Sequence, residues 1–429
     1  MKRFIYLLFF FITPAQEATA QDKEPLEISL IGRYPVPLGL SWYQAQKDAW
    51  EVELKKDKRN EKAWDNYVYA CFAMWQTGEY IIPFLQADGD TLQKTNYQKE
   101  FRSVVKKMKK YIPDTRIYYR YLLVQTTDFQ EQERIYRQII SLKRTCERDY
   151  LDDMRHFYDT HQFEKLKEIA CEWYESGLYS SDLLSYCYNE LAGLGKNAVL
   201  VVQPTANLFY YYLLQYSLGL FKDIEIISSV DLSNPVQGRW FWEKVGVDPK
   251  IFSESKKEAP GAEYFLEREK RPVYFSQFMY DKYLLEALKD KLYPEGLVLK
   301  YSLKPYNNMA VARKNYEQVY LLDYLRRPWS DYHPGITYSM TPNWNYIISF
   351  APLLQFYRTS GDKNQYMKLK SLLQGILDRT HSFKPITADE KLSEAIMARQ
   401  LEMKEKGEAV VKIVDRKDEF QKLIDGIEP

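Results

Sequence analysis

The side chains with the clearest chemical potential gather in a stretch that proline interrupts and that has no helical or strand period. It contains Trp329, Asp331, His333 and Trp344. Aromatic rings beside a carboxylate and an imidazole on a loop could form a glycan subsite or an acid/base pair. We favour the alternative that these rings pack neighbouring elements against one another, because aromatic side chains also fill such seams.

Other catalytic or metal-binding patterns are weak. His156 and His161 are five residues apart, which places them about 140° apart around a helix, so one metal cannot bind both from a single face. No nucleophile elbow, zinc-protease or calcium-loop motif occurs, and no carboxylate pair has a recognisable spacing. We therefore predict no cofactor and no metal, and we favour a binding protein over an enzyme.

The four cysteines leave their redox state open. Cys71, Cys146, Cys171 and Cys187 form no C-x-x-C pair, and each lies in a predicted helix. An even number permits disulfides in an oxidising compartment, but the sequence does not choose the pairing. A buried free thiol is an equally good interpretation at Cys71, whose neighbours are apolar.

The first twenty residues predict export. Lys2 and Arg3 precede the apolar run from Phe4 to Ile12, and a small-x-small site ends at Ala20. This run is too short to span a bilayer, which takes roughly 20 residues, so it reads as a signal peptide cleaved before Gln21. No later apolar run is long enough to span a membrane. We expect a periplasmic or secreted protein with no membrane span after signal cleavage.

Composition narrows the class of partner. The formal net charge is +1, and it falls to zero once Lys2, Arg3 and Glu17 leave with the signal peptide. Nucleic-acid binders usually carry a basic excess, so we do not expect a nucleic-acid partner. The chain is rich in aromatic residues, with 37 tyrosines and 9 tryptophans. Such rings stack on sugars in some exported proteins, but they also pack between helices, which is the interpretation we favour.

The first half predicts a helical-hairpin array. Trp64, Tyr67, Val68 and Cys71 form one stripe of a helix that Gly78 can end. Similar apolar stripes recur to residue 194. With Ala63–Trp64 after a polar turn, this unit resembles a tetratricopeptide repeat, although no strict 34-residue period recurs.

The second half predicts an α/β domain. Ala198 to Val202 is a continuous apolar run, typical of a strand buried on both faces. A helix over 208–218 and a strand over 224–227 follow, so the two strands should be parallel. Further strands are expected at 273–275 and 296–301, with a helix at 281–288 between them.

These elements define the expected organisation. The fold class is mainly α with an α/β domain: an N-terminal tetratricopeptide-like array, a small parallel βαβ sheet and C-terminal helices. In order, we expect a signal peptide (1–20), a helical-hairpin array (21–195), an α/β domain (196–305), a C-terminal helical section (306–385) and a charged helical tail (386–429).

The loop after the first strand is where an open α/β sheet would hold a ligand. It reads Gln203-Pro204-Thr205-Ala206-Asn207 and contains no glycine. A phosphate site needs glycines there so that backbone amides can approach the ligand. We therefore expect no nucleotide, nucleotide sugar or divalent metal to bind at this loop.

The same segment carries a resemblance. Gln215, Gly219 and Asp223, after an aromatic-rich helix start, fit a pattern of strand, loop, helix and strand. In this respect the chain resembles Bacteroidetes-type exported proteins, and the soluble α/β region that follows the membrane part of mannosyltransferase-like proteins. That family has an acidic loop where this chain has Pro204 to Asn207. The resemblance implies the fold, makes Asn207 and Gln215 candidate ligand-binding residues, and implies that a role of the acidic loop has been lost.

The sequence thus favours an exported, non-enzymatic interaction or scaffold protein that binds a partner protein or peptide through its helical array. The alternative is a glycan-binding or glycan-processing protein that acts at the α/β domain.

Overall fold

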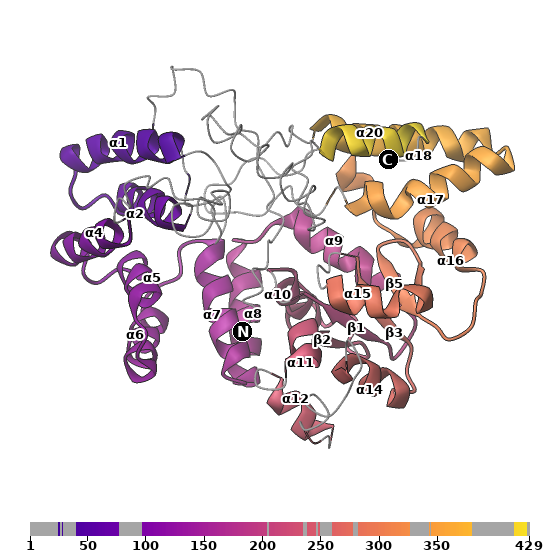
Figure 1. The fold of residues 1–429 in the computed structure, drawn as a ribbon, viewed down its shortest axis with the longest axis horizontal. Helices are drawn as coiled ribbons and strands as arrows, with labels where there is room; N and C mark the ends of the chain where they lie inside the picture. Colours follow the sequence, from indigo (N-terminus) through magenta and orange to yellow (C-terminus); the bar gives the residue numbers. More distant parts are fainter. Residues whose placement is uncertain are drawn as a thin grey trace, which may run out of the picture. The chain divides into compact units, whose positions relative to one another are not determined.

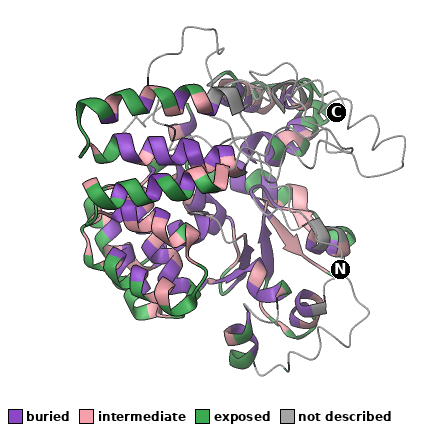
Figure 2. Cartoon of the chain, turned by 60° about the vertical axis from the view of Figure 1, so that its left-hand side comes forward, coloured by how far each residue is buried: buried purple, intermediate pink, exposed green. Residues whose placement is uncertain are grey.

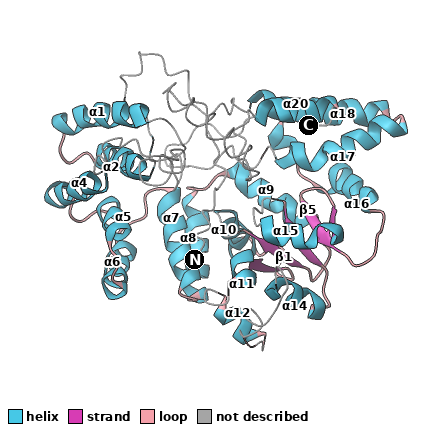
Figure 3. Ribbon diagram, viewed as in Figure 1, coloured by secondary structure: helices cyan, strands magenta, loops and turns pink. Residues whose placement is uncertain are grey.

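A computed structural model describes residues 25, 28, 40–76, 97–203, 206–234, 238–245, 248, 260–277, 282–326, 343, 345–379 and 416–426. Contacts divide the chain into two compact units. One holds the described residues up to 145 together with Arg416, and the other holds 146–379 and 417–426. Both are dominated by helices (Figures 1 and 3). Among the described residues, no helix is long and apolar enough to cross a membrane. The predicted signal peptide lies outside them.

The first unit consists of helices that pack in chain order, α1 on α2, α2 on α4, α4 on α5 and α5 on α6. Their bounds are α1 (Leu40–Lys56), α2 (Glu61–Gln76), α4 (Tyr97–Tyr111), α5 (Arg116–Gln125) and α6 (Phe129–Ser141). The predicted stripe Trp64, Tyr67, Val68 and Cys71 is buried in this unit's core. Helical hairpins are therefore present, whereas Gly78 lies outside the described residues and the tetratricopeptide-like repeat stays a prediction.

Side-chain caps explain where several helices start. The Asn60 side chain accepts a hydrogen bond from the Ala63 amide at 3.0 Å, just before α2. Thr115 caps α5 and Asp128 caps α6 in the same way. Each cap gives a partner to an amide that the helix itself leaves unpaired.

The second unit contains a five-stranded sheet and helices around it. The strands are β1 (Val199–Val202), β2 (Glu225–Ser228), β3 (Val273–Ser276), β4 (Leu292–Pro294) and β5 (Val298–Tyr301). The helices before and between the parallel strands are α7 (Glu147–Asp159), α8 (Phe163–Ser176), α9 (Ser181–Ala192), α10 (Ala206–Tyr212), the π-helical turn η3 (Leu213–Ser217), α11 (Ser229–Ser233), α12 (Arg239–Lys244) and α14 (Pro260–Arg268). After β3 come α15 (Lys282–Leu288), α16 (Asn308–Lys314), α17 (Asn345–Ser360), α18 (Lys363–Arg379) and α20 (Arg416–Asp425).

The strand order is β2-β1-β3-β5-β4. The predicted parallel pair is confirmed, since β1 and β2 run in parallel with Leu200 opposite Ile226. The prediction of a parallel sheet is wrong for the other half, where β3 pairs antiparallel with β5 and β5 antiparallel with β4. Only Glu295, Gly296 and Leu297 separate β4 from β5. So short a connection can form a hairpin but cannot form a parallel crossover.

The two faces of the sheet contact different helices. Val201, Ile227 and Phe275 belong to one buried cluster with residues of α12, α14 and α15. Their neighbours in sequence point to the other face, as Ser276 does when its hydroxyl binds Glu190 of α9. The burial view shows these strands almost entirely purple (Figure 2). The predicted strand 198–202 is thus a central strand buried on both faces.

Helices α7 to α9, which we predicted as the end of the helical array, belong to the unit that holds the sheet. They contact α10 and η3, and the Tyr210 hydroxyl of α10 donates a hydrogen bond to the buried Glu147 of α7. The expected C-terminal helices are also present, with α18 packed on α17 and Lys370 paired with Asp425 of α20 at 3.1 Å.

Candidate functional site

Two regions border the sheet and could hold a ligand. The first lies at the carboxyl ends of the parallel strands, where open α/β sheets usually bind. At its centre is Glu190, which is completely buried. One carboxylate oxygen accepts a hydrogen bond from the Ser276 hydroxyl at 2.6 Å, and the other accepts one from the Tyr211 hydroxyl. We call Glu190, Tyr211 and Ser276, with Gln277 and Ser349 beside them, the carboxyl-end cluster.

Burial dominates the chemistry of Glu190. It raises the pKa of this carboxyl to about 7, although the hydrogen bonds from Ser276, Tyr211 and Tyr186 act in the opposite direction. A carboxyl with such a pKa could exchange protons near neutral pH. None of its surface is accessible, however, so the group joins α9, α10 and β3 rather than facing a substrate.

The rest of this end of the sheet is bonded internally in the same way. The Ser349 hydroxyl of α17 donates to the Gln277 side chain at 2.7 Å. The Asn189 amide donates to the Tyr346 hydroxyl at 2.7 Å, and thereby joins α9 to α17. These groups use one another as partners, which is the pattern of a packed seam between helices and sheet.

Asp231, just after β2, is a further buried carboxyl. It accepts hydrogen bonds from the Tyr158 hydroxyl at 2.5 Å and from the Trp240 indole at 3.3 Å. Burial raises its pKa to about 6, and the two hydrogen bonds act against that shift. The group holds α7 and α12 to the end of β2, again without facing an open cavity in the described part of the chain.

Asn207 lies at this end of the sheet but does not face an open site. It is buried at the start of α10, with 5% of its surface exposed. Its side-chain nitrogen has no hydrogen-bond partner among the described residues. The adjoining positions 204 and 205 are not described.

The second region is an open groove along β2, with a volume of about 790 Å³. Helix α8, the turn η3, helix α12 and the segments before β1 and β2 contribute to its lining. Ile224, just before β2, and Glu225 and Ile226, at the start of β2, also line it. We call this the β2 groove.

Gln215, the second predicted ligand-binding residue of the α/β domain, lines the β2 groove. Its side-chain amide donates to the backbone oxygens of Phe221 at 3.0 Å and Ile224 at 2.7 Å. These bonds fix the turn that leads into β2. Gln215 therefore shapes the wall of the groove, and its donor nitrogen is already used by the protein.

Aromatic rings form much of the remaining wall. Tyr212 and Tyr216 of the helix after β1 stack on each other at 5.4 Å with an interplanar angle of 8°. Trp240 packs against Phe163 on the other side, with ring centroids 5.3 Å apart. Among the described residues, the Tyr212 hydroxyl has no protein hydrogen-bond partner. The groove thus combines apolar rings with a donor that a ligand could use.

The charges in the groove are only partly neutralised. Glu225 pairs with Arg271 at 2.7 Å and with Lys244 at 3.0 Å. These bonds keep the pKa of Glu225 below its ordinary value even though burial, the largest single effect, raises it. Lys167 and Lys222, in contrast, are exposed and form no ion pair within the described chain.

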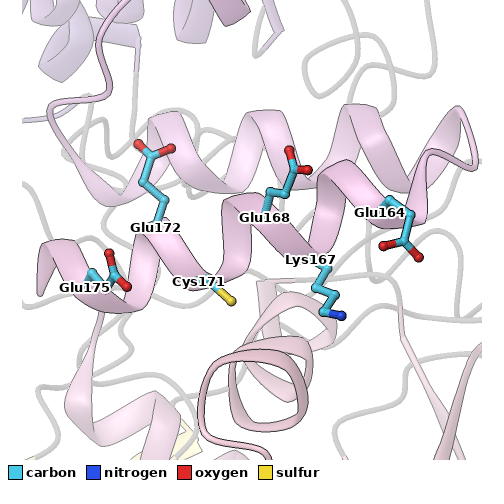
Figure 4. Close-up of a pocket in the computed structure, with 6 residues that line it drawn as sticks. All are labelled: Glu164, Lys167, Glu168, Cys171, Glu172 and Glu175. Carbon is cyan, nitrogen blue, oxygen red and sulfur yellow. The ribbon is translucent and has the colours of Figure 1, made fainter.

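A shallower hollow follows the exposed side of α8 (Figure 4). One helix supplies its lining, which is Glu164, Lys167, Glu168, Cys171, Glu172 and Glu175. Figure 4 shows Glu168 and Glu172 pointing to one side of α8, and Lys167 and Cys171 to the other. No group of three or more His, Cys, Asp and Glu side chains in the described residues could hold a metal ion. This row is a solvated acidic face.

The remaining sequence candidates can be placed as follows. Trp329, Asp331, His333 and Trp344 lie outside the described residues. All four cysteines are free thiols, and burial raises the pKa of Cys71 to about 12, so its thiol is unreactive at neutral pH.

Sequence reasoning missed the β2 groove because nothing in the sequence gives the strand order, and the groove exists only because β2 is an edge strand.

Comparison with known protein families, with curated proteins and with solved structures finds no match to this chain. The resemblance to exported proteins with a soluble α/β region therefore stays a prediction, and only the geometry of the described residues bears on function.

Proposed function

We propose that this chain is an exported, non-enzymatic interaction protein that binds a partner protein or peptide, and that the β2 groove is its binding site. One observation carries the proposal. The groove is open, borders an edge strand and keeps two lysines without ion pairs, whereas the buried carboxyls at the other end of the sheet are bonded internally. Unpaired charge beside partly buried aromatic rings is typical of a surface that a partner completes.

From the sequence alone, we expected the partner to bind to the helical array. The tetratricopeptide-like form of that array remains a prediction, and so does a binding surface on it in the first unit. The β2 groove is the better-supported place because described residues supply a lining with charges and aromatic rings. Export, predicted from residues 1–20, would bring the groove into contact with envelope or extracellular proteins.

Glycan binding at the α/β domain is the second candidate. The stacked rings of Tyr212 and Tyr216, together with the unpartnered Tyr212 hydroxyl, favour it. Sugars bind to proteins through such ring faces and hydrogen bonds. The two candidates use the same groove and differ in the ligand that it should retain.

The test uses the mature chain from Gln21 as bait in the envelope fraction of its native cell, beside an oligosaccharide array. The variant Lys222→Glu changes the groove, and Lys368→Glu makes the same charge change on the exposed side of α18. We expect a protein partner that the parent and Lys368→Glu retain and Lys222→Glu loses. The glycan candidate would be favoured if no protein is retained and an oligosaccharide binds the parent and Lys368→Glu but not Lys222→Glu.

A further inference from the structure

The two edge strands of the sheet differ in how their outer sides are covered. At β4, Pro294 has no amide hydrogen, its carbonyl accepts a hydrogen bond from the Asn308 side chain at 2.8 Å, and α16 packs against the strand. These features prevent a further strand from pairing there. At the opposite edge, β2 pairs only with β1 within the described residues.

The register shows which backbone amide and carbonyl groups of β2 form no hydrogen bond with β1. The Glu225 amide donates to the Ala198 carbonyl at 3.0 Å, so Glu225 and Ile227 direct their backbone groups toward β1. In a parallel ladder, the residue between two such residues directs its backbone amide and carbonyl away from the paired strand. The amide and carbonyl of Ile226 therefore face outward, at a residue that lines the β2 groove.

The groove has walls on both faces of the sheet. Glu225 points toward α12, where it pairs with Lys244. Ile226 points to the opposite face, on the side of Tyr212 and Tyr216. An added strand directs alternate side chains to the two faces of a sheet, so it needs lining on both sides of the edge. The β2 groove provides it.

The excess of cationic side chains in the lining favours extended segments that carry negative charge. Four cationic side chains and two carboxylates line the groove, and Glu225, one of the two, is already held between Arg271 and Lys244. The other, Asp223, accepts a hydrogen bond from the Asn197 amide at 2.9 Å. Lys167 and Lys222 remain for a ligand, and the nearby Glu168 of α8 points away from Lys167 (Figure 4).

We propose that the β2 groove binds an extended, acidic segment of a partner protein, which pairs with β2 as a further strand. The backbone groups of Ile226 supply the pairing, and Lys167 and Lys222 bind carboxylates of the segment. This inference rests on the proposed function and names the kind of ligand that fulfils it. Because the segment is recognised through its backbone and its charge, its amino-acid sequence need not be fixed.

The probe is a displayed library of random ten-residue peptides, selected on the mature chain from Gln21. We expect the selected peptides to be enriched in Asp and Glu and in residues that favour strands. The best peptide, measured by fluorescence anisotropy, should lose at least about tenfold in affinity with Lys222→Glu and less than about twofold with Lys368→Glu. Its affinity should also fall with added salt.

Backbone pairing has a signature that side-chain binding lacks. Methylation of single peptide amides should weaken binding at every second position and leave the positions between almost unchanged, because only alternate amides of an added strand face β2. Each sensitive position should cost about tenfold or more, as expected for a lost hydrogen bond and a steric clash. In the protein, the Ile226 amide should exchange its hydrogen more slowly once the peptide is bound.

The outcomes separate this inference from the proposed function. Peptides that lose affinity with Lys222→Glu but show no alternation on methylation would overturn strand pairing and leave peptide binding at the groove in place. Neutral or basic selected peptides would overturn the acidic assignment. Peptides whose affinity does not change with Lys222→Glu, or an oligosaccharide as the groove's only ligand, would overturn both this inference and the proposed function.

Discussion

The carboxyl-end cluster and the β2 groove border the same sheet, yet they differ in what their polar groups do. In the cluster, Glu190 takes hydrogen bonds from Ser276 and Tyr211, and no surface of the carboxylate remains. In the groove, Lys167 and Lys222 keep their charges without ion pairs in the described chain. The carboxyl ends of parallel strands are the usual place for a ligand. Here the satisfaction of the polar groups, rather than their place in the fold, distinguishes the packed seam from the open surface.

Four substitutions or conditions test this contrast. The largest effect should come from Leu200→Asp, because β1 supports both regions. Leu200 is completely buried in the central strand, so the change would place a carboxylate among apolar residues. We expect a loss of at least about 4 kcal/mol in the free energy of unfolding. Urea unfolding followed by circular dichroism measures it, and a soluble variant that unfolds at the parent's urea midpoint would show that β1 is misassigned.

Glu190→Ala should come next. The change removes the acceptor of the Ser276 and Tyr211 hydroxyls, both of which are buried. Two buried donors without a partner should lower the free energy of unfolding by about 3 kcal/mol. Glu190→Gln keeps an acceptor of the same shape and serves as the control. Equal stabilities of the Ala variant and the parent would mean that the cluster does not join the helices to the sheet.

The pH dependence of stability should reveal the same carboxyl. Burial raises the pKa of Glu190 from an ordinary 4.5 to about 7, so the folded chain binds its proton more tightly than the unfolded chain. The stabilisation is complete below about pH 4.5 and is lost as the pH rises through 7, a change of about 3 kcal/mol. Asp231, with its pKa raised to about 6, contributes with the same sign.

Urea unfolding at pH 5 and pH 8 measures this change. The parent should be less stable at pH 8, and Glu190→Gln should lose much of the difference because its amide does not titrate. A variant with the parent's full pH dependence would assign the effect to other groups and remove Glu190 from the account.

The smallest effect on stability is expected in the groove. Lys222→Glu changes an exposed side chain that forms no ion pair in the described residues, so stability should stay within about 0.5 kcal/mol of the parent. Lys368→Glu on α18 should behave alike. Thermal unfolding by calorimetry checks both. A clear loss of stability with Lys222→Glu alone would show that this lysine serves the fold and is not reserved for a ligand.

The sequence predicted the parts of the fold that depend on local pattern. The run from Ala198 to Val202 indicated a buried strand, and the distance to the next strand indicated a parallel crossover; both are confirmed. It could not predict the antiparallel half, because the choice depends on whether β4 forms. The short segment Leu292–Pro294 has neither a long apolar run nor a clear alternation, and it contains a proline.

The candidate site was less predictable than the fold. Gln215 was chosen from a resemblance, and it does line the groove, but as a side chain whose amide already binds Phe221 and Ile224. Lys167 and Trp240 gave no signal, because they are 73 residues apart in the chain and meet only through the packing of α8 and α12 beside β2. A site along an edge strand depends on strand order, which local pattern does not encode.

The central claim is that the β2 groove, and not the carboxyl-end cluster, binds the partner. The most direct test measures the affinity of one selected acidic peptide for the parent, for Lys222→Glu and for Glu190→Gln under identical conditions. We predict a loss of at least about tenfold with Lys222→Glu and a change of less than about twofold with Glu190→Gln. The reverse pattern, with binding lost in Glu190→Gln and kept in Lys222→Glu, would contradict the account.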